Sequence, residues 1–295
     1  MKQYPVQYLT LPDGETLAFR EAGSGPSVLL IHGNQSSSVH WQPLMERLED
    51  AYHLIAVDLA GCGDSSYRKP FDSLYDLAVQ IERFMAARDL KNIPVIGWST
   101  GGGVAMEMAA SFPGLVSHLV LLSSVGLGGY PVYKIGADGQ PILTERLCSK
   151  AAIAEHPLSV KPVLEAYASG NRAYMKYIWN LLIYQMKPIG DDDFELYLDG
   201  MFKQRNLVDI VHALAHFNLK HESNGCADGS GKVDRITQPV TILQGRQDLV
   251  VPFVWAEEMA QAFGDKATLH LFENGGHSLL TDSADELERI LRAAL

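Results

Sequence analysis

Ser99 lies in a pattern typical of an activated nucleophile. It is the middle residue of G-W-S-T-G at 97–101, which follows an apolar run ending at Ile96 and precedes a helical pattern from Gly101 to Ser111. Where G-x-S-x-G joins a strand to a helix, the serine occupies a strained turn that exposes its hydroxyl. The partial positive charge at the helix N-terminus favours negative charge that develops beside it. We therefore predict that Ser99 is the nucleophile of an acyl transfer; a simple packing turn is the alternative.

A serine nucleophile needs a base, and the base needs an acid that orients it. Asp248 comes shortly after an apolar run that ends at Gln244, and His277 follows the last short apolar run in a glycine-rich loop. In this arrangement His277 accepts the serine proton, while Asp248 fixes the imidazole tautomer and stabilises the imidazolium. An ordinary turn aspartate is the alternative for Asp248. Asp265 and Asp282 lie nearby in the sequence, but neither follows a strand in the required way.

Acyl transfer also requires hydrogen-bond donors for the developing oxyanion. The segment H-G-N-Q ends an apolar run and opens a loop, so we predict the backbone N–H groups of Asn34 and Thr100 as the donor pair. Gln35 is the alternative to Asn34, whereas His32 is expected to be structural. Gln35 and Trp98 are candidate substrate contacts, although packing is the favoured interpretation of Trp98.

Runs of strand length alternate with helical patterns along most of the chain. The first two runs flank a Pro-Asp-Gly turn and predict a hairpin. The later runs are continuously apolar, as in parallel strands buried on both faces. The predicted strands are 7–10, 16–20, 27–32, 53–58, 93–96, 118–123, 240–244 and 268–272, and the predicted helices are 41–48, 74–88, 101–111, 255–263 and 284–295. This alternation predicts an α/β fold with a mostly parallel eight-stranded sheet flanked by helices.

The alternation is interrupted after the sixth predicted strand. Residues 126–235 have helical character and no good strand run, with a glycine- and tyrosine-rich crossing loop at 126–139 and a returning loop at 224–231. We expect a helical cap over the carboxyl ends of the strands, and an α/β core made of residues 1–125 and 236–295.

Composition excludes several classes of protein. The 295 residues carry 24 Lys and Arg against 35 Asp and Glu, a net charge of −11, which disfavours nucleic acid and anionic membranes as partners. The three cysteines are widely spaced and predict unpaired thiols in a reducing compartment and no zinc cage. The start of the sequence lacks the apolar run of a signal peptide, which favours a cytoplasmic location. No metal or cofactor is expected; a metal site at His212 and His216 is disfavoured because no carboxylate stands at a matching offset.

Four motifs together resemble the α/β-hydrolase superfamily. They are H-G-N at 32–34, D-L-A-G-C-G-D-S at 58–65, G-W-S-T-G at 97–101, and the pair Q-G-R-Q-D at 244–248 with G-G-H-S at 275–278. Many members carry histidine where this chain has Cys62, in a turn that is structural. The resemblance implies an eight-stranded sheet with a variable lid. The cap is weakly similar to that of intracellular polyhydroxyalkanoate depolymerase-like hydrolases.

These features favour a cofactor-independent serine hydrolase that cleaves carboxylic esters with small to medium, largely apolar acyl groups, hydroxyalkanoate esters among them. Serine at position 99 argues against epoxide opening and dehalogenation, because the resemblance associates these reactions with aspartate at the nucleophile position. A lactonase or carbon–carbon bond hydrolase using the same residues, and a non-catalytic ligand-binding receptor, are the alternatives. The expected partner is a small-molecule ester, and a homodimer is left open.

Overall fold

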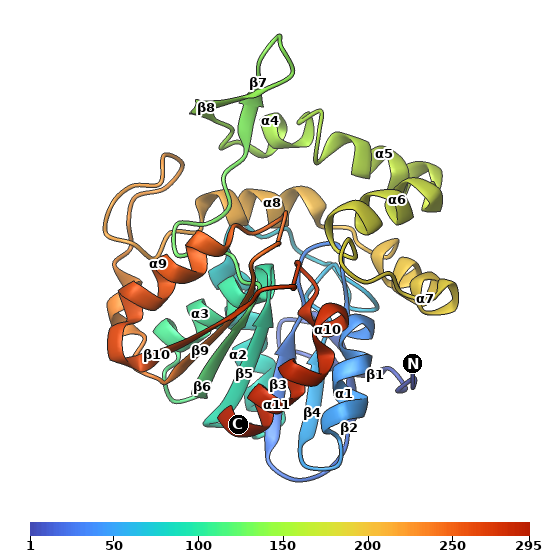
Figure 1. The fold of residues 1–295 in the computed structure, drawn as a ribbon, viewed down its shortest axis with the longest axis vertical. Coiled ribbons are helices and arrows are strands. Elements are labelled where there is room, and N and C mark those ends of the chain that lie inside the picture. Colours follow the sequence, from blue (N-terminus) through green and yellow to red (C-terminus); the bar gives the residue numbers. More distant parts are fainter.

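A computed structural model describes residues 1–295, and an eight-stranded sheet runs through its centre (Figure 1). Its strands are β1 (Gln7–Thr10), β2 (Thr16–Ala22), β3 (Ser27–Ile31), β4 (His53–Val57), β5 (Ile93–Trp98), β6 (Val116–Leu122), β9 (Val240–Gly245) and β10 (Ala267–Phe272). They are ordered β1-β2-β4-β3-β5-β6-β9-β10. The β1–β2 and β2–β4 pairs are antiparallel and all the others are parallel. The predicted mostly parallel sheet is therefore confirmed.

Helices cover both faces of this sheet, because alternate strand residues point to opposite sides. In β3, Val28 and Leu30 belong to one hydrophobic core, and Leu29 and Ile31 belong to the other. One core includes apolar residues of α1 (Gln42–Leu48) and α11 (Ala284–Ala294), and the other those of α2 (Leu74–Ala87), α3 (Thr100–Ser111) and α9 (Phe253–Phe263). Short helical turns are η1 (Ser38–Trp41), η2 (Lys232–Arg235), η3 (Gly264–Lys266) and α10 (Leu279–Asp282). Burial on both faces explains the continuous apolar runs of the central strands.

The chain between β6 and β9, residues 123–239, is called the insert below. It contains β7 (Tyr133–Ile135), β8 (Pro141–Arg146), α4 (Lys150–Ala154), α5 (Lys161–Ser169), α6 (Arg172–Leu182), α7 (Asp191–Met201) and α8 (Leu207–His216). In Figure 1 the insert, coloured green to light orange, extends beyond the end of the sheet where α8 crosses the molecule. Its position after the sixth strand agrees with the sequence prediction.

The insert is not purely helical, which corrects the sequence analysis. β7 and β8 pair antiparallel as a separate two-stranded hairpin within and just after the predicted crossing loop. Most residues of β8 are exposed, so the strand lacks the apolar run by which buried strands are recognised.

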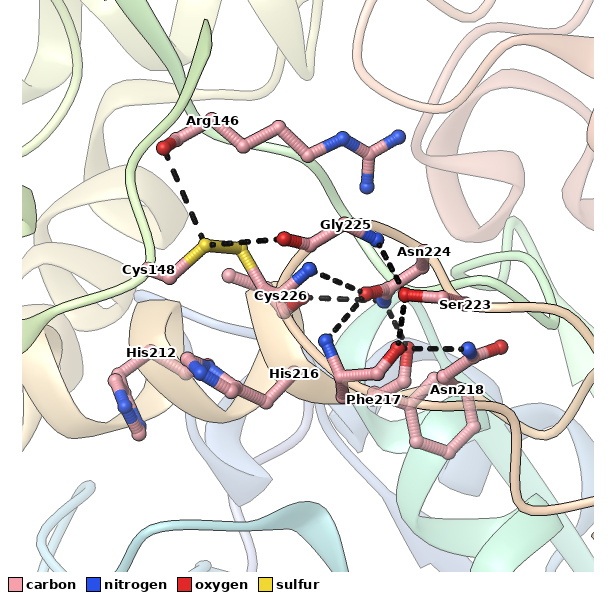
Figure 2. The surroundings of a disulfide bond; sticks show 12 residues. Arg146, Cys148, His212, His216, Phe217, Asn218, Ser223, Asn224, Gly225 and Cys226 are labelled. Carbon is pink, nitrogen blue, oxygen red and sulfur yellow. Dashed lines mark hydrogen bonds between the residues drawn. A yellow bond between two sulfur atoms is a disulfide. The ribbon is translucent and has the colours of Figure 1, made fainter.

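Two of the three cysteines are paired, which also corrects the sequence analysis. Cys148, just after β8, forms a disulfide with Cys226 in the returning loop, 78 residues further along the chain (Figure 2). Only Cys62 is free, and it is buried. Spacing along the sequence does not reveal this pair, because the fold brings the loop back beside the hairpin. A disulfide is typical of oxidising surroundings and weighs against the reducing compartment inferred from the sequence.

None of the helices combines the length and the apolar character needed to cross a bilayer.

Candidate active site

Ser99 occupies the sharp turn between β5 and α3. Its backbone has φ 54° and ψ −117°, a positive-φ conformation that is unusual for a residue with a side chain. Its N–H donates to the Leu122 carbonyl at 3.0 Å, and its own carbonyl accepts from Gly102 and Val125 at 3.0 and 3.2 Å. The turn is thus held by β6 and by the start of α3, and Ser99 stands at the N-terminus of that helix.

Close backbone contacts explain the glycines on either side of Ser99. A Cβ atom at Gly97 would lie 2.3 Å from the Gly101 oxygen, and one at Gly101 would lie 2.1 Å from the Ile31 oxygen. Gly33 is also closely packed, because a Cβ atom there would lie 3.0 Å from Ser99 Cβ. These contacts pack the loop after β3 directly against the serine.

Asp248 and His277 form a buried hydrogen-bonded pair. His277 Nδ1 lies 2.9 Å from Asp248 Oδ2, and Gln244 Nε2 donates to the same oxygen at 2.9 Å. The other carboxylate oxygen accepts from the backbone N–H groups of Val250 and Val251, each at 2.8 Å. The carboxylate therefore accepts four hydrogen bonds, which fixes its position at the end of β9.

The electrostatics of this pair favour an ionised carboxylate. Burial is the largest influence and by itself raises the pKa of Asp248, because it disfavours the charged form. Attraction to His277 and the hydrogen bonds from His277, Val251 and Val250 outweigh burial and leave the pKa of Asp248 below its usual value. A carboxylate that remains ionised is suited to stabilising an imidazolium.

Trp98 supports the histidine instead of lining the cavity. Its indole Nε1 donates to the His277 carbonyl at 3.0 Å, and the two rings lie with centroids 5.7 Å apart. The side chain is buried among aromatic residues that include Trp41 and Trp179. The structure thus gives Trp98 a packing and supporting place and no contact with the cavity, unlike the substrate contact considered from the sequence.

Ser99 and the Asp248–His277 pair come from neighbouring parts of the same sheet edge. Trp98, next to Ser99 in the chain, bonds the His277 backbone, while Val250 and Val251 hold Asp248 and line the same cavity as Ser99. The structure contains no hydrogen bond between Ser99 and His277. Such bonds are often loose without a substrate, so their absence does not remove His277 as a candidate base.

Two backbone donors beside Ser99 have no partner in the protein. The N–H groups of Asn34 and Thr100 donate to no other group, and both residues line the cavity. The first N–H groups of a helix lack an intrahelical acceptor, which accounts for Thr100. The N–H of Gln35 is already used, since it donates to Asn34 Oδ1 at 2.9 Å. This geometry favours Asn34 over Gln35 as the first backbone donor.

A cavity of about 410 Å³ opens in front of Ser99. Its walls come from the insert and from the loops after β3 and β9, and they are mainly apolar, with Val125, Val132, Val160, Leu214 and Val251 among them. None of the lining residues is Lys, Arg, Asp or Glu. The cavity is therefore suited to an uncharged, largely apolar ligand.

The sequence analysis missed three residues that hold the site. Gln244 holds Asp248 in place, and its side chain is fully buried. The sequence feature that could have identified it is a polar glutamine at the end of an otherwise apolar strand. From the insert, Gln204 Nε2 donates to Asn34 Oδ1 at 2.8 Å, and Trp179 Nε1 donates to Gln35 Oε1 at 3.3 Å. No local pattern identifies these two, because their partners lie more than 140 residues away.

Comparison with known proteins agrees with the fold and the sequence motifs. The model of the "Alpha/beta hydrolase family" matches residues 28–290. An uncharacterized protein of Mycobacterium tuberculosis is 30% identical over 280 residues, which cover 92% of this chain and 75% of that protein. A 2-hydroxy-6-oxononadienedioate/2-hydroxy-6-oxononatrienedioate hydrolase of Cupriavidus pinatubonensis is 24% identical, covering 97% of this chain and 93% of that protein.

A solved structure agrees with the same architecture. The esterase from Exiguobacterium antarcticum superposes with a TM-score of 0.73, covering 97% of this chain and 98% of that one, at 21% identity. At this identity the similarity concerns the fold alone.

Proposed function

This chain belongs to the alpha/beta hydrolase family, and within that family we propose that it is a serine hydrolase that cleaves carboxylic esters of largely apolar acyl groups. One observation carries the proposal. Ser99 stands in a strained turn at the start of a helix, facing an apolar cavity that also presents the unpaired N–H groups of Asn34 and Thr100. A reactive hydroxyl next to two free donors is the arrangement that acyl transfer requires.

The proposed reaction has two steps. His277 accepts the hydroxyl proton as Ser99 Oγ attacks the ester carbonyl, and the Asn34 and Thr100 amides stabilise the oxyanion. Collapse of the tetrahedral intermediate expels the alcohol, which takes the proton from His277, and leaves an acyl-enzyme. His277 then takes a proton from a water molecule that attacks the acyl-enzyme. Collapse of the second tetrahedral intermediate breaks the bond to Ser99 Oγ, which takes that proton back from His277, and the acid is released. Asp248 stabilises the imidazolium in both steps.

The uncharged cavity bears on the choice among substrates. The Cupriavidus relative is named for substrates that are dioates, and two carboxylates call for cationic partners. The absence of Lys and Arg from the lining favours neutral esters over such diacids. We also propose that residues 126–235 act as a cap that encloses the acyl group, since they supply much of the apolar wall.

Labelling with a fluorophosphonate, followed by peptide mapping, tests the nucleophile directly. We expect one label, on Ser99, and loss of both labelling and p-nitrophenyl ester turnover in Ser99→Ala, with the melting temperature retained. Ser169→Ala, at an exposed serine that ends α5, is the matched control. A panel of p-nitrophenyl esters, lactones and ring-cleavage diketones separates ester cleavage from the alternatives. Binding without turnover or labelling would instead indicate a receptor.

A further inference from the structure

The side-chain amide of Asn34 is held by two hydrogen bonds, and both end on its oxygen. Asn34 Oδ1 accepts from the backbone N–H of Gln35 at 2.9 Å and from Gln204 Nε2 at 2.8 Å. Asn34 Nδ2 has no partner in the protein, although Asn34 lines the cavity beside Ser99.

Chemistry fixes which end of this amide faces the protein. A backbone N–H can only donate, so the atom opposite Gln35 N must be the Asn34 oxygen. The reversed orientation would set two donors against each other and would leave the oxygen unpaired. Nδ2 is consequently the end that is free to donate to a bound molecule.

Gln204 is oriented in the same way by groups behind it. The Ala60 carbonyl, which can only accept, takes a hydrogen bond from Asn206 Nδ2 at 2.5 Å, so Asn206 presents its oxygen to Gln204. Gln204 Nε2 donates to that oxygen at 2.8 Å, and the Tyr167 hydroxyl donates to Gln204 Oε1 at 3.2 Å. Gln204 and Asn206 are both buried. The insert thus holds Asn34 through a chain of amides whose directions are all determined.

The backbone places Asn34 close to the reacting atoms. Gly33, the residue before it, packs on Ser99, because a Cβ atom at Gly33 would lie 3.6 Å from Ser99 Oγ. Asn34 therefore lines the cavity next to Ser99, and an ester carbonyl attacked by Ser99 Oγ must lie in the same cavity.

We propose that Asn34 Nδ2 is a third donor to the oxyanion, in addition to the backbone N–H groups of Asn34 and Thr100. Gln204 is the positioning residue that aims it. This assignment rests on the proposed function, because it concerns the transition state of the same reaction. It makes the insert a contributor to the oxyanion site as well as a wall of the cavity.

Two substitutions of Asn34 separate a donor role from a structural one. Asn34→Ala removes the side chain and keeps the backbone N–H, and we expect kcat to fall about 10²-fold with KM little changed. Asn34→Asp keeps an oxygen for Gln35 and Gln204 but replaces the N–H₂ group by oxygen. A donor role requires Asn34→Asp to be less active than Asn34→Ala, whereas a purely structural role requires the reverse. Asn180→Asp, the same change at an exposed position on α6, is the control and should leave kcat unchanged.

A double-mutant cycle tests the role of Gln204. Gln204→Met removes the amide at similar size, and we expect kcat to fall about tenfold in the wild-type background and to stay unchanged in the Asn34→Ala background. An equal loss in both backgrounds would show that Gln204 does not act through Asn34 and would overturn that part of the proposal.

Fluorophosphonate labelling of the wild type distinguishes the two levels of failure. If Ser99 is not labelled, the proposed function fails and this inference fails with it. If Ser99 is labelled and the wild-type protein turns over ester, but Asn34→Ala and Asn34→Asp keep the wild-type kcat, only the assignment of Asn34 Nδ2 as a third donor fails.

Discussion

His277 Nδ1 lies 2.9 Å from Asp248 Oδ2, with the two side chains only 4% and 0% exposed. Burying a charge pair usually adds little net stability, because desolvation offsets the attraction between the charges. The surrounding fold nevertheless supplies three further hydrogen bonds to the carboxylate, from Gln244, Val250 and Val251. A buried carboxylate–imidazole pair maintained in this way is better explained by a role in chemistry than by a role in stability.

Asp248→Asn should preserve the shape of the pair and reduce activity strongly. The amide cannot stabilise an imidazolium, and its N–H₂ group favours the wrong tautomer of His277, so we expect kcat for p-nitrophenyl esters to fall about 10³- to 10⁴-fold at pH 7.5. Asp265→Asn, at an exposed aspartate in η3, is the matched control and should behave like wild type. A variant that retains a tenth of wild-type kcat would count against Asp248 as the acid of the site.

Ester turnover should increase with pH between pH 5 and 8. Only the neutral imidazole can take the Ser99 proton, so turnover should be lost where His277 is protonated. The pKa of Asp248 is below its usual 3.8, so the carboxylate is already ionised and should add no second step to the rise. Measurement of kcat/KM from pH 4.5 to 9 checks this. A flat profile from 5 to 8 would contradict the assignment of His277 as base.

His40 should make the fold sensitive to acid. Burial, followed by the neighbouring His32, lowers the pKa of His40 to about 3 from 6.5. The unfolded chain therefore binds more protons than the folded one between these two values, and stability falls as pH falls through this window. For one group with these values, the free energy of unfolding should drop by about 2 kcal/mol between pH 7 and 5.

His40→Phe tests this contribution by removing the titrating group while keeping a ring that can stack on Tyr197, whose centroid lies 4.3 Å away. Denaturant unfolding at pH 7 and 5 should show a smaller loss of stability for this variant than for wild type. His221→Phe, at an exposed histidine, should keep the wild-type loss. Equal losses in wild type and His40→Phe would refute the prediction.

Much of the sheet and of the site could be predicted because burial and turn geometry leave recognisable patterns in the local sequence. Central strands are buried on both faces and are therefore continuously apolar. The Ser99 turn requires glycines on both sides, and these form a recognisable sequence motif. The aspartate and the histidine follow strands at the same edge of the sheet, and this made Asp248 and His277 recognisable as candidates.

Contacts between distant segments could not be predicted in the same way. The β7–β8 hairpin is largely exposed and has no apolar period, and the partner of Cys148 is set by where the returning loop comes back. Gln204 and Trp179 look like ordinary insert residues until the fold brings them to Asn34 and Gln35.

The Cys148–Cys226 pair gives a prediction that needs no assay of activity. It joins the end of β8 to a loop that Asn224 ties to α8 and to the segment after β6, because Asn224 Nδ2 donates to the carbonyls of Gly128, Ala215 and Phe217. Protein unfolded without reductant should expose one thiol per chain, that of Cys62, and three after reduction. Titration with Ellman's reagent checks this, and three thiols without reductant would contradict the disulfide.

The same bond should stabilise the fold by restricting the unfolded chain. A disulfide typically contributes about 2–4 kcal/mol, so the free energy of unfolding of the Cys148→Ser/Cys226→Ser double variant should be lower than that of the wild type by that amount. Dithiothreitol should destabilise the wild type to the same extent and leave the double variant unchanged, since that variant has no bond to reduce. Equal stability of wild type and double variant under oxidising conditions would mean that the disulfide does not stabilise the fold.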